Sequence, residues 1–335
     1  MLNQKIIESF NKKNILVTGG TGMIGRQVVR ILSKTNSKIR IVSLDDLIVD
    51  KKAEHVLGDL TNFAFCKNIT EGMDYVFHIA GIGASVEATD TKIASHFVPM
   101  LMMNTNILEA CRINKVEKVV YTSSVGAYAQ AEVFVESEYS LDSFPMDFGG
   151  WAKRMAEAQI HAYKIEHGLS NYSIVRPSNV YGPGDNFNPK NSLVIPSLMY
   201  RIYHKEDPLV VWGDGSAVRD FVYSEDVAEG IILALYYGTN SGFVNLGSGI
   251  PCTIKSLVNT LQNLIGFNFV FDGSKPIGAS RRLMDLTLSE KTIHYKANTK
   301  LADGLKKTWE WFIANPDEHK KKVNHFINAE MMDIK

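Results

Sequence analysis

A glycine-rich turn near the start of the chain, Thr18-Gly-Gly-Thr-Gly-Met-Ile-Gly25, offers the first recognisable chemistry. An apolar run over 14–17 precedes the turn and a helical pattern over 26–32 follows it, so the predicted order is strand, tight turn and helix. Backbone N–H groups at such a helix N-terminus can bind a diphosphate. The turn therefore predicts a dinucleotide-binding site, and an ordinary strand–helix turn is the alternative.

An acidic residue at the end of the second predicted strand extends this pattern. Asp45 lies 20 residues after Gly25, which is the separation at which a carboxylate accepts hydrogen bonds from an adenosine ribose. Because a carboxylate there repels a 2′-phosphate, we expect NAD rather than NADP. Asp46 could be the ligand instead, and a solvated loop acid is the alternative.

The chain around the turn alternates between strand and helix patterns. Helical spacing predicts helices over 23–34, 95–114 and 151–167. Apolar, strand-like runs occupy 14–18, 39–44, 54–59, 74–80, 118–124 and 172–176. Continuous apolar strands between helices imply a parallel sheet that is covered on both faces.

The later part of the chain is richer in glycine, proline and asparagine. The expected elements are helices near 192–204, 225–237 and 301–314, short strands near 209–212 and 243–246, and a loop over 181–187. We therefore predict an α/β fold with a Rossmann-type doubly wound parallel sheet, mainly residues 1–178. A smaller C-terminal α+β lobe is expected, mainly residues 179–335, with the chain crossing back between the two lobes.

The composition narrows the function classes. Lysine plus arginine and aspartate plus glutamate both number 36, so the formal net charge is zero and neither nucleic acid nor a membrane is indicated as a partner. Cys66, Cys111 and Cys252 are few and far apart, which favours neither a metal site nor a disulfide framework. The sequence has no signal-type or membrane-spanning apolar run, so we expect a cytoplasmic protein.

Five further motifs follow in order along the chain. They are Gly58-Asp59-Leu60, His78-Ile79-Ala80-Gly81, Thr122-Ser123-Ser124, Arg176-Pro-Ser-Asn-Val-Tyr-Gly-Pro183 and Arg219-Asp220-Phe221. Together with the glycine-rich turn, they resemble the extended short-chain dehydrogenase/reductase family, and the last two resemble its nucleotide-sugar branch. The segments 184–187 and 191–196 are similar to members that act on GDP-sugars, the GDP-fucose synthase group in particular.

The resemblance implies NAD as the cofactor and assigns residues to it. Asp59 and Leu60 would flank the adenine, and Ala80 and Gly81 would lie near the phosphates or the nicotinamide ribose. Lys153 matches the family's catalytic lysine, whose ammonium holds the ribose hydroxyls and lowers a neighbouring pKa by its field. The implied cofactor-binding residues are Gly19, Gly22, Met23, Ile24, Gly25, Asp45, Asp59, Leu60, Ala80, Gly81, Lys153 and Pro177.

The resemblance also assigns residues to catalysis and to a nucleotide-sugar substrate, with no metal. Ser124 matches the catalytic serine or threonine, whose hydroxyl can hydrogen-bond a reacting alkoxide. Arg219 would bind the nucleotide diphosphate through its guanidinium, and Tyr128 and Asn179 would also contact the substrate. The alternatives are a serine that ends a strand, an exposed helix lysine at position 153 and an arginine in a surface salt bridge.

Several positions depart from the family pattern. The family's proton-transferring tyrosine stands four residues before the lysine; here that position is Gly149, and 145–155 contains no tyrosine. Val125 and Gly126 replace the Asp-Glu pair of the dehydratases, so elimination of water is disfavoured. Gly126 and Leu193 stand where GDP-fucose synthase has the cysteine and histidine that invert carbons beside a ketone. Hydride transfer is the chemistry that the remaining residues support.

We therefore expect an NAD-dependent oxidoreductase that oxidises the C4 hydroxyl of a GDP-mannose-like or GDP-heptose-like nucleotide sugar for polysaccharide biosynthesis. Tyr128, His78, Tyr139 or a water relayed through Lys153 could accept the hydroxyl proton. The alternatives are a nucleotide-sugar epimerase with a transient 4-keto intermediate and a cofactor-binding protein with impaired catalysis.

The resemblance further implies a homodimer, because family members commonly dimerise through a four-helix bundle. The candidate helices are 95–114 and 151–167. Met102, Met103, Ile160 and Tyr163 could supply their apolar faces, or they could pack inside the subunit.

Overall fold

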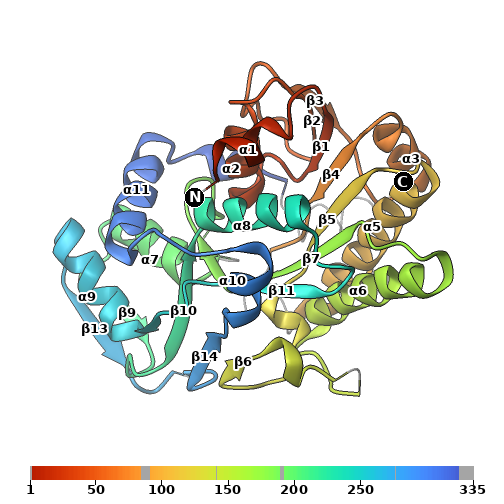
Figure 1. Cartoon of the computed structure of the whole chain (residues 1–335). Helices are drawn as coiled ribbons and strands as arrows, with labels where there is room; N and C mark the ends of the chain where they lie inside the picture. The colour runs from red at the N-terminus through yellow and green to blue at the C-terminus, as the bar shows by residue number, and fades with distance from the viewer. Residues whose placement is uncertain (1, 84–90, 141, 189–191, 276, 324–335) are drawn as a thin grey trace.

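A seven-stranded sheet forms the larger part of the protein, of which the computed structural model describes residues 2–83, 91–140, 142–188, 192–275 and 277–323 (Figure 1). Every pair of neighbouring strands in it is parallel. In spatial order the strands are β11 (Phe243–Leu246), β7 (Tyr172–Pro177), β5 (Lys118–Thr122), β4 (Tyr75–His78), β1 (Asn14–Thr18), β2 (Lys38–Ser43) and β3 (Glu54–Leu57). The strand order reverses at β1, which places a crevice beyond its carboxyl end and confirms the predicted Rossmann-type sheet.

Helices cover both faces of this sheet because its strands are apolar on both sides. Ile15 and Val17 of β1 belong to the apolar core of one face, whereas Leu16 belongs to the core of the other. The helices of the first face are α2 (Met23–Leu32) and α8 (Ser224–Tyr237), and those of the second are α3 (Phe63–Thr70), α5 (Ile93–Ile113) and α6 (Phe148–His167). Short α1 (Gln4–Glu8) adds Ile6 to the first core.

The smaller lobe has its own sheet and core. Its strands are β12 (Pro251–Thr253), β10 (Val218–Tyr223), β14 (Arg281–Met284), β6 (Val133–Phe134) and β8 (Asn179–Tyr181), with a separate pair formed by β9 (Leu209–Trp212) and β13 (Phe269–Asp272). Its helices are α7 (Val194–Tyr203), α9 (Ile254–Ile265), α10 (Thr287–Ile293) and α11 (Leu301–Ala314). β6 joins this sheet from the first half of the chain, and β11 returns to the large sheet from the second half. Within the described ranges, every helix is too short or too polar to cross a lipid bilayer.

The predicted start of the helix over 151–167 is wrong, because α6 begins at Phe148. Two consecutive glycines have poor helix propensity, but the carboxylate of Asp147 caps this end and accepts a hydrogen bond from the Gly150 N–H at 2.6 Å. A side chain at Gly150 would begin 2.0 Å from the Gly126 carbonyl oxygen, so this close approach needs glycine. Gly149 therefore lies in the first turn of α6.

The predicted loop over 181–187 is also wrong at its first residue. Tyr181 ends β8, and its partner in the parallel register is Tyr223 of β10. The elements β6, α9, β12, β13, β14 and α10 were not predicted. The four short strands among them carry little periodic signal, whereas the apolar residues of α9 recur at helical spacing and could have revealed this helix. The predicted strands 14–18, 209–212 and 243–246 and the helix 301–314 match β1, β9, β11 and α11.

Three of the four residues suggested for a dimer interface pack inside the subunit. Ile160 is 0% exposed, and Met103 and Tyr163 are 9% exposed. They belong to the core beneath α5 and α6, which lie side by side on one face of the sheet (Figure 1). Of the four, Met102 is the exposed one, at 45%.

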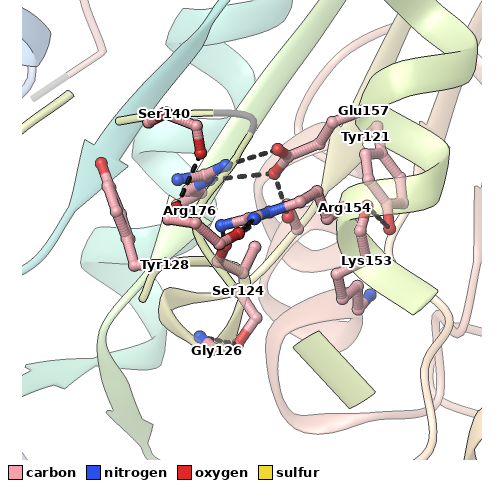
Figure 2. Close-up of polar contacts among 12 residues, drawn as sticks. Tyr121, Ser124, Gly126, Tyr128, Ser140, Lys153, Arg154, Glu157 and Arg176 are labelled. Carbon is pink, nitrogen blue, oxygen red and sulfur yellow. Dashed lines mark hydrogen bonds and ion pairs between the residues drawn. The ribbon is translucent and has the colours of Figure 1, made fainter. Parts of the chain in front are cut away.

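A buried ion pair joins α6 to β7 of the large sheet (Figure 2). The guanidinium of Arg176, on β7, donates two hydrogen bonds to the carboxylate of Glu157, on α6, and the first is 2.9 Å long. Ser123, just after β5, donates a third hydrogen bond to Glu157. The rings of Tyr128, Tyr139 and Phe243 surround the Arg176 guanidinium, whose carbon lies 3.6 Å from the Phe243 centroid.

We predict that Glu157→Gln lowers the free energy of unfolding by about 3–5 kcal/mol, because it leaves the Arg176 charge buried without its counter-ion. Urea unfolding followed by circular dichroism measures the change. The matched control is Glu54→Gln, which removes the more exposed ion pair with Arg40 and should cost less than about 1 kcal/mol. Equal losses in both variants would contradict this assignment.

Candidate functional site

The glycine-rich turn forms a cradle of backbone at the carboxyl end of β1. Gly19 has a φ of +68°, and a side chain there would begin 2.8 Å from the Cα of Ala80. A side chain at Gly25 would begin 2.2 Å from the Gly19 carbonyl oxygen. Gly22 caps α2, so the N–H groups of the first turn of this helix face the crevice. The turn thus exposes backbone donors where a diphosphate can approach closely.

A cavity of about 440 Å³ lies over this cradle. Of the two acids proposed from the sequence, Asp45 lines it and Asp46 does not. Lys153 and Pro177 are the two predicted cofactor residues that are not part of its lining. The predicted cofactor residues that line it are Gly19, Gly22, Met23, Ile24, Gly25, Asp45, Asp59, Leu60, Ala80 and Gly81.

A segment after α11, residues 318–323, closes one side of the cavity; we call it the C-terminal strap. Its Val323 N–H donates to Asp45 Oδ1 at 2.8 Å, while the Thr21 hydroxyl donates to Asp45 Oδ2 at 3.0 Å. Glu318 of the strap forms an ion pair with Arg26 of α2 at 2.6 Å. The sequence contains no signal for the hydrogen bond between Val323 and Asp45, because these residues are 278 positions apart.

Asp185 adds a further polar group to the cavity wall. Its Oδ1 accepts the Asn186 N–H at 2.7 Å, whereas its buried Oδ2 has no hydrogen-bond partner among the described residues. Burial raises the pKa of this carboxyl to about 7, so at neutral pH it can be protonated and donate a hydrogen bond. The cavity therefore combines the backbone donors of the glycine-rich turn, the Asp45 carboxylate and the Asp185 carboxyl. These groups fit a nicotinamide dinucleotide.

Ser124 lies just after the end of β5, and Lys153 lies on α6 (Figure 2). The Lys153 ammonium donates to the Thr122 carbonyl at 2.8 Å and lies 3.4 Å from where a side chain at Gly81 would begin. Burial lowers the pKa of Lys153 to about 8, although the Glu157 carboxylate opposes that effect. Ser124 caps the short helix Val125–Ala127, and its Oγ accepts the Gly126 N–H at 3.1 Å.

Three side chains considered from the sequence as proton acceptors have structural contacts. His78 is fully buried between Thr18 and Asn104, and burial lowers its pKa to about 3. The Tyr128 hydroxyl donates to Asn245 at 2.9 Å, and burial raises its pKa far above the physiological range. Tyr139 packs on the guanidinium groups around Glu157, and its pKa is also raised by burial.

The place of a side chain at Gly149 is taken by another residue, His96 of α5. A side chain at position 149 would begin 2.6 Å from Cε1 and 3.2 Å from Nδ1 of this imidazole. His96 is 6% exposed, and its Nε2 lies 2.9 Å from the Ile82 carbonyl oxygen. Sequence reasoning missed His96, because the contact joins two helices whose relative rotation the sequence does not reveal.

On the side of the smaller lobe, Arg219 has a second arginine beside it. Arg219 of β10 and Arg282 of β14 are direct partners in the parallel register of the two strands. Arg219 donates to the Val218 and Ala279 carbonyls at 2.8 Å, and Arg282 donates to Gln130 at 3.1 Å. Burial lowers the pKa of both groups, and Arg282 lowers that of Arg219 further.

Two neighbouring cations on one edge are suited to a group with two negative charges. Sequence reasoning found Arg219 and missed Arg282. The available signal was the basic pair Arg281-Arg282 in an apolar context, in the lobe expected to hold a diphosphate. Asn179 lies on the neighbouring strand, where its side chain donates to the Asp220 carbonyl at 3.0 Å.

Comparisons with known proteins show the family of this chain. The NAD dependent epimerase/dehydratase family matches residues 15–247, and the chain belongs to it. The probable GDP-L-fucose synthase 1 of Oryza sativa subsp. japonica is 30% identical over 321 residues, covering 92% of this chain and 94% of the relative. The GDP-L-fucose synthase of Escherichia coli (strain K12) is 29% identical over 328 residues, covering 92% of this chain and 98% of the relative.

The solved structures include a UDP-glucose 4-epimerase of Thermotoga maritima with UDP-glucose. The match has a TM-score of 0.80 and 26% sequence identity, and it covers 90% of this chain and 99% of the epimerase chain. The resemblance to the nucleotide-sugar branch of the extended short-chain dehydrogenases/reductases is thereby confirmed. The chain is an NAD(P)-dependent enzyme of this family.

Lys153 makes stability depend on pH in a direction set by its burial. Folding lowers its pKa from 10.5 to about 8, so between these values the unfolded chain binds a proton that the folded protein does not. We predict that the free energy of unfolding rises over this pH range, by at most about 3 kcal/mol. Urea unfolding at several pH values measures the rise, and Lys153→Met should abolish it. If the free energy of unfolding depends on pH in the same way in the wild type and in Lys153→Met, the lowered pKa of Lys153 is contradicted.

Proposed function

We propose that this enzyme oxidises the C4 hydroxyl of a nucleotide-linked sugar with NAD, most simply a GDP-mannose-like or GDP-heptose-like substrate used for polysaccharide. The observation that carries the proposal is the position of Lys153 and Ser124. Lys153 lies against Gly81 in the wall of the cofactor cavity, and Ser124 lies against Gly126. Asp147, which is also beside Gly126, acts electrostatically on Arg282 of the smaller lobe. A sugar held there has its diphosphate among the arginines and its ring beside the serine hydroxyl.

Each side chain has a distinct task in this reaction. NAD, when bound, supplies the hydride acceptor. Ser124 donates a hydrogen bond to the reacting oxygen, and the Lys153 ammonium holds the ribose hydroxyls and stabilises negative charge nearby. Arg219 and Arg282 neutralise the nucleotide diphosphate, which orients the sugar for transfer.

The residues around Ser124 disfavour further chemistry on the sugar. Val125 and Gly126 follow it in a short 3₁₀ helix and carry no group that can move a proton. Leu193 lies just before α7, is 48% exposed and is equally inert. Elimination of water, or inversion of the carbons beside a ketone, requires acid–base groups that these positions do not provide.

We infer NAD rather than NADP from the surroundings of Asp45. Its two oxygens accept hydrogen bonds from Thr21 and Val323, which hold the carboxylate in the cavity wall. An added 2′-phosphate would meet this negative charge at close range. The cavity therefore favours an adenosine with two ribose hydroxyls.

Epimerisation at C4 is the second candidate. It is favoured by the structural similarity to a UDP-glucose 4-epimerase. An epimerase forms the same 4-keto sugar transiently and returns the hydride to the opposite face. It therefore gives no net change in the cofactor.

The test is incubation of the purified protein with NAD and a panel of GDP- and UDP-linked sugars. The expected result is absorbance of reduced nicotinamide together with a 4-keto sugar, two hydrogens lighter than the substrate by mass spectrometry. An epimeric product without net cofactor reduction would favour the epimerase. A product that has lost water, or that carries solvent deuterium at C3 or C5, would overturn the proposal.

We predict that Arg282→Gln raises the KM for the nucleotide sugar by about tenfold or more, because a charge-assisted hydrogen bond contributes roughly 1.5–3 kcal/mol. Arg281→Gln is the matched control, since successive side chains of a strand point to opposite faces and Arg281 pairs with Val218 instead. Steady-state kinetics at saturating NAD measures both variants. Equal KM values for the two would argue against a diphosphate site at Arg282.

A further inference from the structure

We propose that Lys322 of the C-terminal strap binds the diphosphate of the dinucleotide, so that the cofactor is held from two sides, by the glycine-rich turn and by the strap. The two segments lie at opposite ends of the described chain. The proposal concerns the cofactor alone, and it holds whichever sugar the enzyme acts on.

The charges in the cavity wall are the first argument. Three carboxyl groups, those of Asp45, Asp59 and Asp185, line the cavity. Among the described residues of this lining, Lys322 is the only lysine or arginine. The diphosphate of a dinucleotide brings further negative charge into this acidic cavity. A cation that faces the diphosphate therefore favours binding.

The hydrogen bonds of Lys322 are the second argument. An ammonium has three N–H donors, and Lys322 donates one hydrogen bond, to the Gly184 carbonyl oxygen. Glu318, Asp45 and Asp185 act on it through their fields, but none of these described carboxylates forms an ion pair with it. Lys322 is half-buried, and burial, together with the charge of Arg26, lowers its pKa. An anion beside the ammonium would supply the missing partner.

A series of contacts places this ammonium close to the glycine-rich turn. Arg26 of α2 donates to the Thr21 carbonyl in the turn at 2.7 Å. Gly184 packs on the same guanidinium, because a side chain there would begin 2.2 Å from Arg26 Nε. Lys322 in turn bonds Gly184. The ammonium therefore lies near the backbone N–H groups that fit a diphosphate.

Two contacts fix the strap on either side of Lys322. Before it, Glu318 forms the ion pair with Arg26 at 2.6 Å. After it, the Val323 N–H donates to Asp45 Oδ1 at 2.8 Å. The ion pair also compensates the charge of Arg26, whereas the charge of Lys322 remains available to a ligand. A side chain whose backbone is held in this way loses less conformational entropy when it binds.

Two other polar atoms indicate that the same wall receives a polar ligand. Asp185 Oδ2 and His319 Nδ1 are buried and have no hydrogen-bond partner among the described residues. Both residues line the cavity, and His319 belongs to the strap. Buried polar atoms in folded proteins are normally hydrogen-bonded. The strap side of the cavity is therefore built for a polar group.

Two other roles for Lys322 make different predictions. If it only fastened the strap through Gly184, its loss would weaken every ligand that binds beneath the strap, adenosine included, because Val323 and His319 line the same cavity. If it bound the 2′-phosphate of NADP, its loss would weaken NADP and spare NAD. The Asp45 carboxylate, which repels a 2′-phosphate, argues against the second role.

The experiment measures the Kd of adenosine, ADP-ribose, NAD and NADP for the full-length chain freed of bound nucleotide. Calorimetry serves for the phosphorylated ligands and NMR titration for adenosine. Lys322→Met removes the charge and keeps a long side chain. Lys320→Met is the matched control, because it removes a charge from the same strap. Lys320 is exposed, forms an ion pair with Asp317 at 2.6 Å and lies outside the cavity lining.

We expect Lys322→Met to weaken the binding of ADP-ribose and NAD about tenfold or more, as the loss of a charge-assisted hydrogen bond does. Adenosine, which has no phosphate, should bind as it does to the wild type, and Lys320→Met should bind all four ligands unchanged. Wild-type affinity of Lys322→Met for NAD would overturn the proposal. An equal loss for adenosine, or a loss confined to NADP, would overturn it as well.

Discussion

The site depends on the buried ion pair between Arg176 and Glu157. Gly149, Lys153 and Glu157 recur at every fourth residue of α6, so they lie on one face of the helix. The ion pair, together with the hydrogen bond from Ser123, fixes which way that face points. It therefore sets the rotation that brings the Lys153 ammonium beside Gly81 and leaves Gly149 beneath the His96 ring.

Charge is distributed unevenly across the site. Asp45 is held by hydrogen bonds in the cavity wall, and Arg219 and Arg282 are paired on adjacent strands of the smaller lobe. Lys153 is buried against Gly81 of the cavity wall, and burial lowers its pKa. A carboxylate is suited to ribose hydroxyls, and two guanidinium groups are suited to a diphosphate. Both lobes contribute to this distribution of charge, and β6 and β11 tie each sheet to the other part of the chain.

Much of the fold could be predicted because its signals are local. The apolar runs that became β1, β4, β5 and β7, and the glycine-rich turn after β1, are visible in short windows. Asp45 could be proposed from its distance to Gly25 and lies in the cavity wall. The start of α6 was misjudged because the cap at Asp147 outweighs the low helix propensity of two glycines.

The sequence by itself determined the class of fold, the nucleotide-binding turn and the absence of a tyrosine four residues before Lys153. These follow from residue types and from spacings along a single element. The tertiary structure alone decided that His96 lies over Gly149, that Arg282 pairs with Arg219, and that the C-terminal strap reaches Asp45. Each of these contacts joins elements far apart in the chain. Their geometry depends on helix rotation and strand register, which the packing of the whole molecule fixes.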